Sequence, residues 1–132
     1  MLLTNLTKSK IDEKLLLAVD KKAAVVLGDK KLIEVSLVIC GEQKIKAINK
    51  KYRGQNRVTD VLSFEDLNEI FICLPRARQQ AKALKHSLNC ELTRLFVHGI
   101  VHLKGYDHEK STKEAERMFE IEEKILKAIL KS

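Results

Sequence analysis

The sequence has three cysteines, one proline and no tryptophan, and each scarcity argues against a class of protein. Cys40, Cys73 and Cys90 are far apart and form no C-x-x-C pair, so neither a disulfide framework nor a cysteine-ligated zinc finger is indicated. We expect all three to be reduced, buried and structural. A single proline beside 45% hydrophobic and 33% charged residues is typical of a globular protein, not of a disordered one.

Long apolar runs are also lacking, and none approaches the roughly 20 residues that a helix needs to cross a bilayer. The N-terminus shows no basic segment followed by an apolar core, as a signal peptide would. We therefore expect a cytoplasmic protein with no membrane partner. A chain of 132 residues is long enough for one domain and too short for two ordinary ones, so we expect a single domain over residues 1–132.

Aromatic residues are few, four Phe and two Tyr, which argues against a base-stacking surface of the RRM kind. Basic residues outnumber acidic ones 25 to 18 and give a net charge of +7. The segment 42–58 has six basic side chains against one acidic, whereas 107–123 has seven acidic against three basic. This asymmetry favours a surface that attracts phosphates, although a lysine-rich helix is more often only a solvated face.

Hydrophobic periodicity predicts an α+β fold with a small mixed sheet of about four strands and about five helices. Strands are expected at 1–7, 32–40, 61–64 and 70–73, the last two compatible with a hairpin. Helices are expected over 11–28, 44–52, 75–85 and 90–103, and after a capping box formed by Ser111 and Glu114. The helix 90–103 is apolar on most sides, which is typical of a helix buried in the core.

Three histidines near the end of that central helix carry the strongest chemical signal. His98 and His102 are four residues apart, so they project from one helix face and can share one ion. Gly105 permits a left-handed turn that can bring His108 back toward the same ion. Three neutral imidazoles suit Zn²⁺, with Ni²⁺ or another divalent transition metal possible, and leave a position open for water. We predict a hydrolytic metal site. We interpret His86, outside this pattern, as an ordinary histidine at a helix end.

The same histidine spacing occurs in zinc proteases of the form H-E-x-x-H-x-x-G-x-x-H, whose glutamate is the general base. Here that position is Gly99, so the usual route to peptide cleavage is missing. Asp107 is the nearest carboxylate that could serve as a base. Equally, it could orient a histidine ligand or cap the following turn.

Two segments carry a family resemblance. His98 to His108 reads H-G-x-x-H-L-x-G-Y-D-H, and an earlier segment reads N-x-x-Y-R-G-x-x-x-x-T-D-V-L-S-F. The second is made by Asn49, Tyr52, Arg53, Gly54, Thr59, Asp60, Val61, Leu62, Ser63 and Phe64. On these residues the chain resembles the bacterial YbeY family of metal-dependent endoribonucleases. It departs from the family pattern at Glu65 and at Asn68 and Glu69, which bears on the shape of the cleft beside the strands.

The resemblance implies zinc bound by His98, His102 and His108, and a functionally important arginine at Arg53. It also implies cleavage of single-stranded RNA, with roles in maturing the 3′ end of 16S ribosomal RNA and in ribosome quality control. The expected partners are therefore rRNA and the small ribosomal subunit with its proteins, and no DNA is expected. The guanidinium of Arg53 suits a role in binding RNA because it can bind a phosphate through two hydrogen bonds. Without the resemblance, Arg53 would be a surface charge at a helix end.

Two other functions remain open from the sequence. One is a metal hydrolase that acts on peptides or small molecules, suggested by the protease-like spacing. The other is a ribosome assembly factor without cleavage activity, in which the metal only ties the C-terminal turn to the core.

Overall fold

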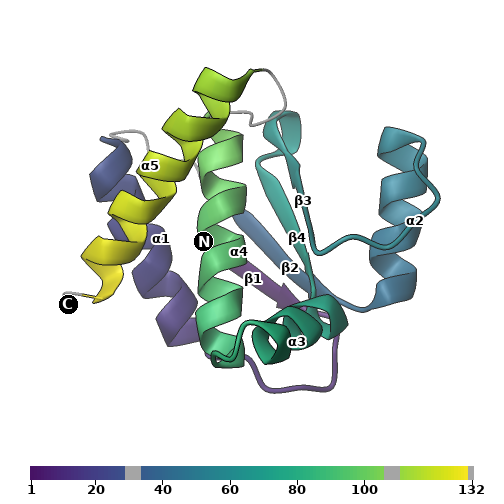
Figure 1. Cartoon of the computed structure of the whole chain (residues 1–132). Helices are drawn as coiled ribbons and strands as arrows, with labels where there is room; N and C mark the ends of the chain where they lie inside the picture. The colour runs from purple at the N-terminus through teal and green to yellow at the C-terminus, as the bar shows by residue number, and fades with distance from the viewer. Residues whose placement is uncertain (29–33, 106–110, 131–132) are drawn as a thin grey trace.

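Four short strands form one mixed sheet in the order β1–β2–β4–β3, in the computed structural model of the chain (Figure 1). The structure describes residues 1–28, 34–105 and 111–130. The strands are β1 Leu2–Asn5, β2 Ser36–Cys40, β3 Val61–Phe64 and β4 Glu69–Cys73. β1 and β4 both run parallel to β2, whereas β3 and β4 form an antiparallel hairpin. The expected α+β class, mixed sheet and hairpin are confirmed.

Side chains on β2 and β4 alternate between two apolar clusters, one on each face of the sheet. Leu37, Ile39, Ile70 and Ile72 belong to the larger cluster, which also contains the inner faces of α1, α4 and α5. Val38, Cys40 and Cys73 belong to a smaller cluster with Ile45 and Ile48 of α2. Both faces of the central strands are therefore covered, which explains why their sequence reads as a continuous apolar run.

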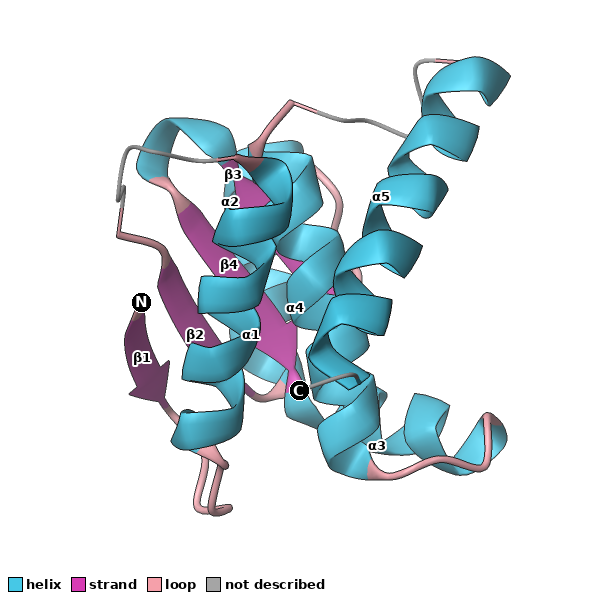
Figure 2. Ribbon diagram, turned by 90° about the vertical axis from the view of Figure 1, so that its left-hand side faces the viewer, coloured by secondary structure: helices cyan, strands magenta, loops and turns pink. Residues whose placement is uncertain are grey.

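Five α-helices surround the sheet: α1 Glu13–Leu27, α2 Glu42–Arg53, α3 Leu74–Ala83, α4 Leu88–Leu103 and α5 Thr112–Leu130. α4 lies between the sheet and α5 and contacts α1, α3, α5, β3 and β4, whereas α2 lies on the opposite face (Figure 1). Viewed from the side, α1 lies in front of the sheet and α5 beside it (Figure 2). The prediction of a buried central helix carrying the histidines is confirmed, since Leu95, Phe96 and Val101 of α4 are fully buried.

The helix ends follow the predicted signals. Gly28 and Gly54 end α1 and α2 in the left-handed conformation, with φ of +64° and +67°. The Ser111 hydroxyl accepts a hydrogen bond from the Glu114 backbone N–H, as expected of a cap. Within the described ranges, no helix has the length and apolar character to cross a membrane.

One expectation about the cysteines is wrong. Cys40 and Cys73 are buried between the sheet and α2, but Cys90 is exposed in the first turn of α4. The reason is helical phase, because the neighbouring Glu91, Leu92 and Leu95 take the inward positions and turn Cys90 to the solvent.

Candidate functional site

His98 and His102 lie one turn apart on α4 and line the same cleft, as the sequence predicts. The cleft has a volume of about 440 Å³ and is lined by β3, one of the two edge strands of the described sheet. Its remaining lining comes from the end of α2, the segment that follows it, and β3: Asn49, Arg53, Gln55, Arg57, Thr59, Asp60, Val61, Leu62 and Ser63. Segments far apart in the chain therefore meet at the two histidines.

The imidazole of His98 is held by a carboxylate from the last helix. Its Nδ1 lies 2.5 Å from Oε1 of Glu122 on α5, and both side chains are mostly buried. When the Nδ1–H donates a hydrogen bond to the carboxylate, the lone pair of the neutral ring is on Nε2, which is then able to bind a metal ion. This is the arrangement by which carboxylates commonly orient histidine ligands.

His102 presents a different feature. Its Nδ1 is buried, and in the part of the chain that the structure describes it has no hydrogen-bond partner. A buried ring nitrogen without a partner costs free energy, so such atoms usually mark a place where water, an ion or another group binds. Two imidazoles on one helix face, one oriented by a carboxylate and one with a buried nitrogen unsatisfied, fit a divalent transition metal.

The third predicted ligand, His108, and the predicted carboxylate, Asp107, lie outside the described residues. Correspondingly, no group of three His, Cys, Asp or Glu side chains able to share an ion occurs among residues 1–28, 34–105 and 111–130. Gly105 does adopt the expected positive φ, +91°, directly after α4. A side chain at this φ would be strained, so glycine is the residue that suits the turn.

Arg53, the predicted phosphate-binding residue, reaches the cleft from the end of α2. Its Nη2 donates a hydrogen bond to the carbonyl oxygen of Ser63 on β3, at 2.8 Å. The guanidinium carbon also lies 5.5 Å from the centre of the Phe64 ring. These contacts fix an otherwise exposed side chain at the cleft, where the guanidinium still has further N–H donors for an anion.

The segment between α2 and β3 is tied down by two polar side chains. The amide of Asn49, buried on α2, donates to the Arg57 carbonyl at 3.1 Å. Asp60 accepts from the Val61 N–H at 2.8 Å and from the side chain of Gln80 at 3.1 Å. Both arginines of the cleft, Arg53 and Arg57, therefore lie on a fixed wall, and that wall is predominantly basic.

Gly99 explains why this cleft has no glutamate after its first histidine. A Cβ at Gly99 would lie 2.9 Å from Cγ2 of Ile70 and 3.2 Å from Oγ of Ser63, closer than side chains normally approach. The Gly99 carbonyl also accepts a hydrogen bond from the Ser63 hydroxyl at 3.4 Å. Position 99 thus packs against the sheet, and a side chain there would collide with β3 and β4. Position 99 therefore cannot supply the glutamate base of the zinc proteases.

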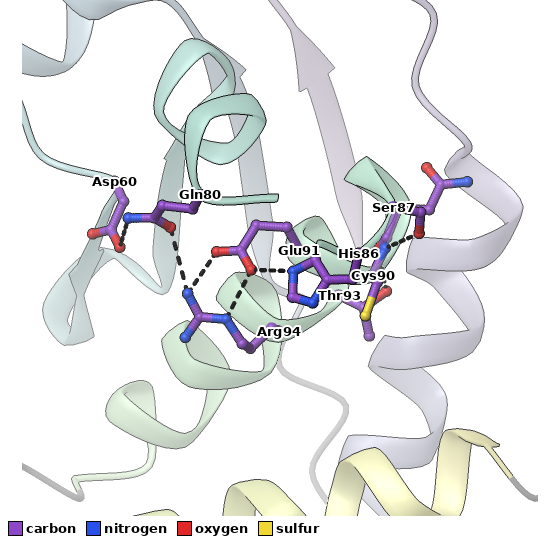
Figure 3. A network of polar contacts seen from close by, with 9 residues as sticks. Asp60, Gln80, His86, Ser87, Cys90, Glu91, Thr93 and Arg94 are labelled. Atoms are coloured by element: carbon purple, nitrogen blue, oxygen red, sulfur yellow. Dashed lines mark hydrogen bonds and ion pairs between the residues drawn. The ribbon is translucent and has the colours of Figure 1, made fainter. Parts of the chain in front are cut away.

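A polar network reaches the cleft from the other end of α4 (Figure 3). The fully buried carboxylate of Glu91 accepts hydrogen bonds from Nε and Nη2 of Arg94 at 2.9 and 2.5 Å, and its Oε1 lies 2.8 Å from Nε2 of His86. Arg94 then contacts Gln80, which donates to Asp60 at the cleft. The hydrogen bonds with Glu91 raise the pKa of the Arg94 guanidinium, so the guanidinium stays charged. His86 therefore has a structural role between α3 and α4.

Several of these residues escaped the sequence patterns. Glu122 is one of seven acids in an acidic segment, and nothing in its spacing marks it as the partner of His98. Glu91 and Arg94 lie three apart on a helix, a common pairing, but the burial of Glu91 depends on the packing of α3.

Comparisons with known proteins show the family of this chain. The family model described as Endoribonuclease YbeY matches residues 3–130. The Endoribonuclease YbeY of Thermodesulfovibrio yellowstonii is 41% identical over 118 residues, covering 81% of this chain and 74% of that protein. The Aquifex aeolicus protein of the same name is 41% identical over 109 residues, covering 76% and 73%. Among solved structures, the solution structure of TM1509 from Thermotoga maritima has a TM-score of 0.64 and 32% identity, covering 97% of this chain and 89% of that one.

Proposed function

Because the chain belongs to the Endoribonuclease YbeY family, we propose that it cleaves single-stranded RNA in the cleft of His98 and His102, with zinc as its metal. The observation that carries this proposal is the meeting of three features in one cleft. Two histidines share a helix face, a carboxylate orients one of them, and Arg53 lines the same cleft, held by the Ser63 carbonyl. This combination of groups suits the hydrolysis of a phosphodiester.

His98, His102 and His108 would hold the ion, the last from the segment that follows Gly105. A divalent ion bound there supplies a Lewis acid that polarises a phosphoryl oxygen and lowers the pKa of water. The fit rests on the buried, unsatisfied Nδ1 of His102 and on the Glu122 carboxylate beside His98. Zinc suits three neutral imidazoles better than magnesium or calcium, which prefer oxygen ligands.

Arg53 would bind the phosphate and hold it in line with the histidines. Its hydrogen bond to the Ser63 carbonyl removes much of the rotational freedom that a long side chain loses on binding. The remaining N–H donors can then contact the phosphate oxygens, on which negative charge develops during the reaction. Arg57 adds positive charge to the same wall. Hydrolysis breaks one P–O bond, forms another to the oxygen of water, and requires a proton for the leaving oxygen.

Asp107 remains our candidate for the base that takes a proton from the attacking water, with orientation of a histidine ligand as its alternative role. The two roles separate on replacement by asparagine. If Asp107 is the base, Asp107→Asn should lose turnover and keep its metal content. If Asp107 orients a histidine ligand, the variant should lose metal affinity as well.

The exposed lysines of α2 would guide RNA to the cleft. Lys44, Lys46, Lys50 and Lys51 all point to solvent on the helix that ends in Arg53. Such a basic helix attracts the phosphate backbone without reading its sequence. We propose rRNA as the substrate, including the 3′ end of 16S rRNA, with the small ribosomal subunit as partner, roles in rRNA processing and ribosome quality control, and the cytoplasm as the place of action.

The test combines metal content with cleavage of a labelled single-stranded RNA by wild type, His102→Ala and Arg53→Ala. Arg78→Ala is a matched control, because that arginine contacts Ser9 away from the cleft. We expect about one metal ion per chain in the wild type, in line with a single mononuclear site. Cleavage should be lost in both cleft variants and kept in the control, and single-stranded DNA of the same sequence should not be cut.

Bound metal without any cleavage by the wild type would contradict the proposal and favour the assembly factor. Under that alternative, a chelator should unfold the protein or release it from the small subunit. A hydrolase of peptides is disfavoured by the packing of Gly99 against the sheet, and a peptide library would show its absence directly.

A further inference from the structure

Although the chain has few aromatic residues, three of the six gather at one place. Tyr52, Phe64 and Phe71 line a second hollow of about 290 Å³, between α2 and the β3–β4 hairpin. We call this hollow the aromatic groove; its other lining residues are Lys44, Ala47, Ile48, Lys51, Leu67 and Glu69. The low aromatic content argued against base stacking, but the tertiary structure concentrates the rings that exist.

The rings are held by one another and remain accessible. Tyr52 and Phe64 pack edge to face with their centres 5.5 Å apart, and Phe64 and Phe71 do the same at 5.9 Å. Phe64 is the middle ring of the three, and Tyr52, which packs against it, is still 56% exposed. The groove thus offers a rigid aromatic side chain that a planar, apolar ligand could stack on without first ordering it.

The charges at the groove indicate what kind of planar ligand suits it. Lys44 and Lys51 contribute two positive charges and Glu69 one negative, and the ammonium of Lys51 lies 5.3 Å from the centre of the Tyr52 ring. A nucleotide matches this pattern, because its base is planar and its phosphate is anionic. Stacking on aromatic rings beside basic side chains is the usual way in which proteins bind single-stranded nucleic acid.

Arg53 connects the aromatic groove to the cleft. Its guanidinium lines the cleft and lies over the Phe64 ring of the groove. Along β3 the neighbouring residues point to opposite faces, so Ser63 contacts α4 near His98 while Phe64 faces α2. The two hollows therefore lie on either side of the edge strand, with Arg53 between them.

From this arrangement we propose that the aromatic groove binds one unpaired RNA base, next to the phosphate that Arg53 holds. The inference rests on the proposed function, because it names a subsite for the same substrate. It also gives a physical reason for the preference for single strands, since a base paired in a duplex cannot enter the groove. Glu69 of the groove, the first residue of β4, is one of the positions at which the sequence departs from the family pattern.

The test measures the anisotropy of a labelled single-stranded oligoribonucleotide, and of copies with an abasic nucleotide at each position in turn. We expect Tyr52→Ala and Tyr52→Leu to weaken binding about tenfold, within the range for loss of one stacked base. Tyr52→Phe should bind like the wild type. Phe119→Ala is the matched control, because that ring is 62% exposed on α5, away from both hollows.

The wild type should also bind one abasic oligonucleotide about tenfold more weakly than the intact one, and Tyr52→Ala should not distinguish the two. Equal binding by wild type and both non-aromatic variants, with folding confirmed by circular dichroism, would overturn the inference. So would variants that keep RNA binding but lose the small ribosomal subunit, because the groove would then bind protein. Failure of the proposed function looks different: the wild type would cleave no RNA, whatever its binding.

Discussion

The Nδ1 atom of His98 on α4 lies 2.5 Å from Oε1 of Glu122 on α5, so the last helix of the protein orients the first histidine of the cleft. The two residues are 24 positions apart, and the contact forms only because α5 packs along α4. It makes the C-terminal helix part of the site as well as part of the core.

Replacing Glu122 should therefore weaken metal binding. We expect Glu122→Ala to lower zinc affinity roughly 10- to 100-fold, because the imidazole loses the group that fixes its orientation. The zinc affinity of Glu122→Gln should lie between those of the wild type and Glu122→Ala. Competition with a chromophoric chelator measures the affinity. Glu120→Ala, which removes an exposed carboxylate from the same helix, should bind zinc like the wild type. Unchanged affinity in Glu122→Ala would show that the carboxylate has no part in metal binding.

The close approach of α4 to the sheet predicts the effect of a single added methyl group. Gly99→Ala places a Cβ 2.9 Å from Ile70, which should cost about 1–3 kcal/mol, while the better helix propensity of alanine offsets about 0.5–1 kcal/mol. We expect net destabilisation of about 1–2 kcal/mol in urea denaturation. Gly99→Glu should prevent folding, because it also buries a carboxylate.

Gly41 provides the matched control for this prediction. Among the described residues, no atom outside its immediate neighbours lies within 4 Å of the position that a Cβ at Gly41 would take, so Gly41→Ala should cost less. Equal stabilities for the two alanine variants would contradict the steric account.

The buried carboxylate of Glu91 makes Arg94 important for stability. Removing one partner of a buried ion pair typically costs about 3–5 kcal/mol, and because Arg94 is 43% exposed we expect Arg94→Met to lie at or below the lower end. Arg78→Met, which removes an exposed arginine bonded only to Ser9 among the contacts described, should cost far less. Adding Glu91→Gln to Arg94→Met should recover stability, since it removes the unpaired charge. Further loss in the double variant would contradict this account and show that the contact with His86 is enough to stabilise the Glu91 carboxylate.

The three cysteines should differ sharply in reactivity. Burial raises the pKa of the Cys40 thiol from 9.0 to about 11, with the nearby Cys73 adding to the effect, and burial also raises the pKa of Cys73. Near neutral pH, iodoacetamide should therefore label only the exposed Cys90 in the folded protein, and Cys90→Ser should abolish labelling. Mass spectrometry of the labelled peptides distinguishes the sites. Rapid labelling of Cys40 without unfolding would contradict its burial.

The same shift predicts a loss of stability in alkali. The folded state holds the Cys40 proton more tightly than the unfolded chain, so its contribution is complete below pH 9 and decreases as the pH rises from 9.0 toward about 11. Over this pH range the free energy of unfolding of Cys40→Ala should fall less than that of the wild type. Denaturation curves for wild type and variant across that pH range provide the comparison, and parallel curves would show that the thiol does not contribute.

Much of the fold was readable in the sequence, because its signals are local. The glycines that end α1 and α2, the cap at Ser111 and the apolar runs of β2 and β4 each depend on neighbouring residues, and all are confirmed. The spacing of His98 and His102 is local too, since one helical turn places both on one face. The exposure of Cys90 was missed because it depends on which side of α4 the sheet and α5 cover.

The sequence by itself determined which residues could carry the chemistry: two histidines one helical turn apart, a third after a glycine, and a basic helix ending at Arg53. Only the tertiary structure decided what surrounds them. It placed Glu122 on His98, tied Arg53 to the Ser63 carbonyl, packed Gly99 against Ile70, and gathered three scattered rings into the aromatic groove. These contacts join residues distant in the chain, and their formation depends on how the helices and the sheet pack, which no local pattern encodes.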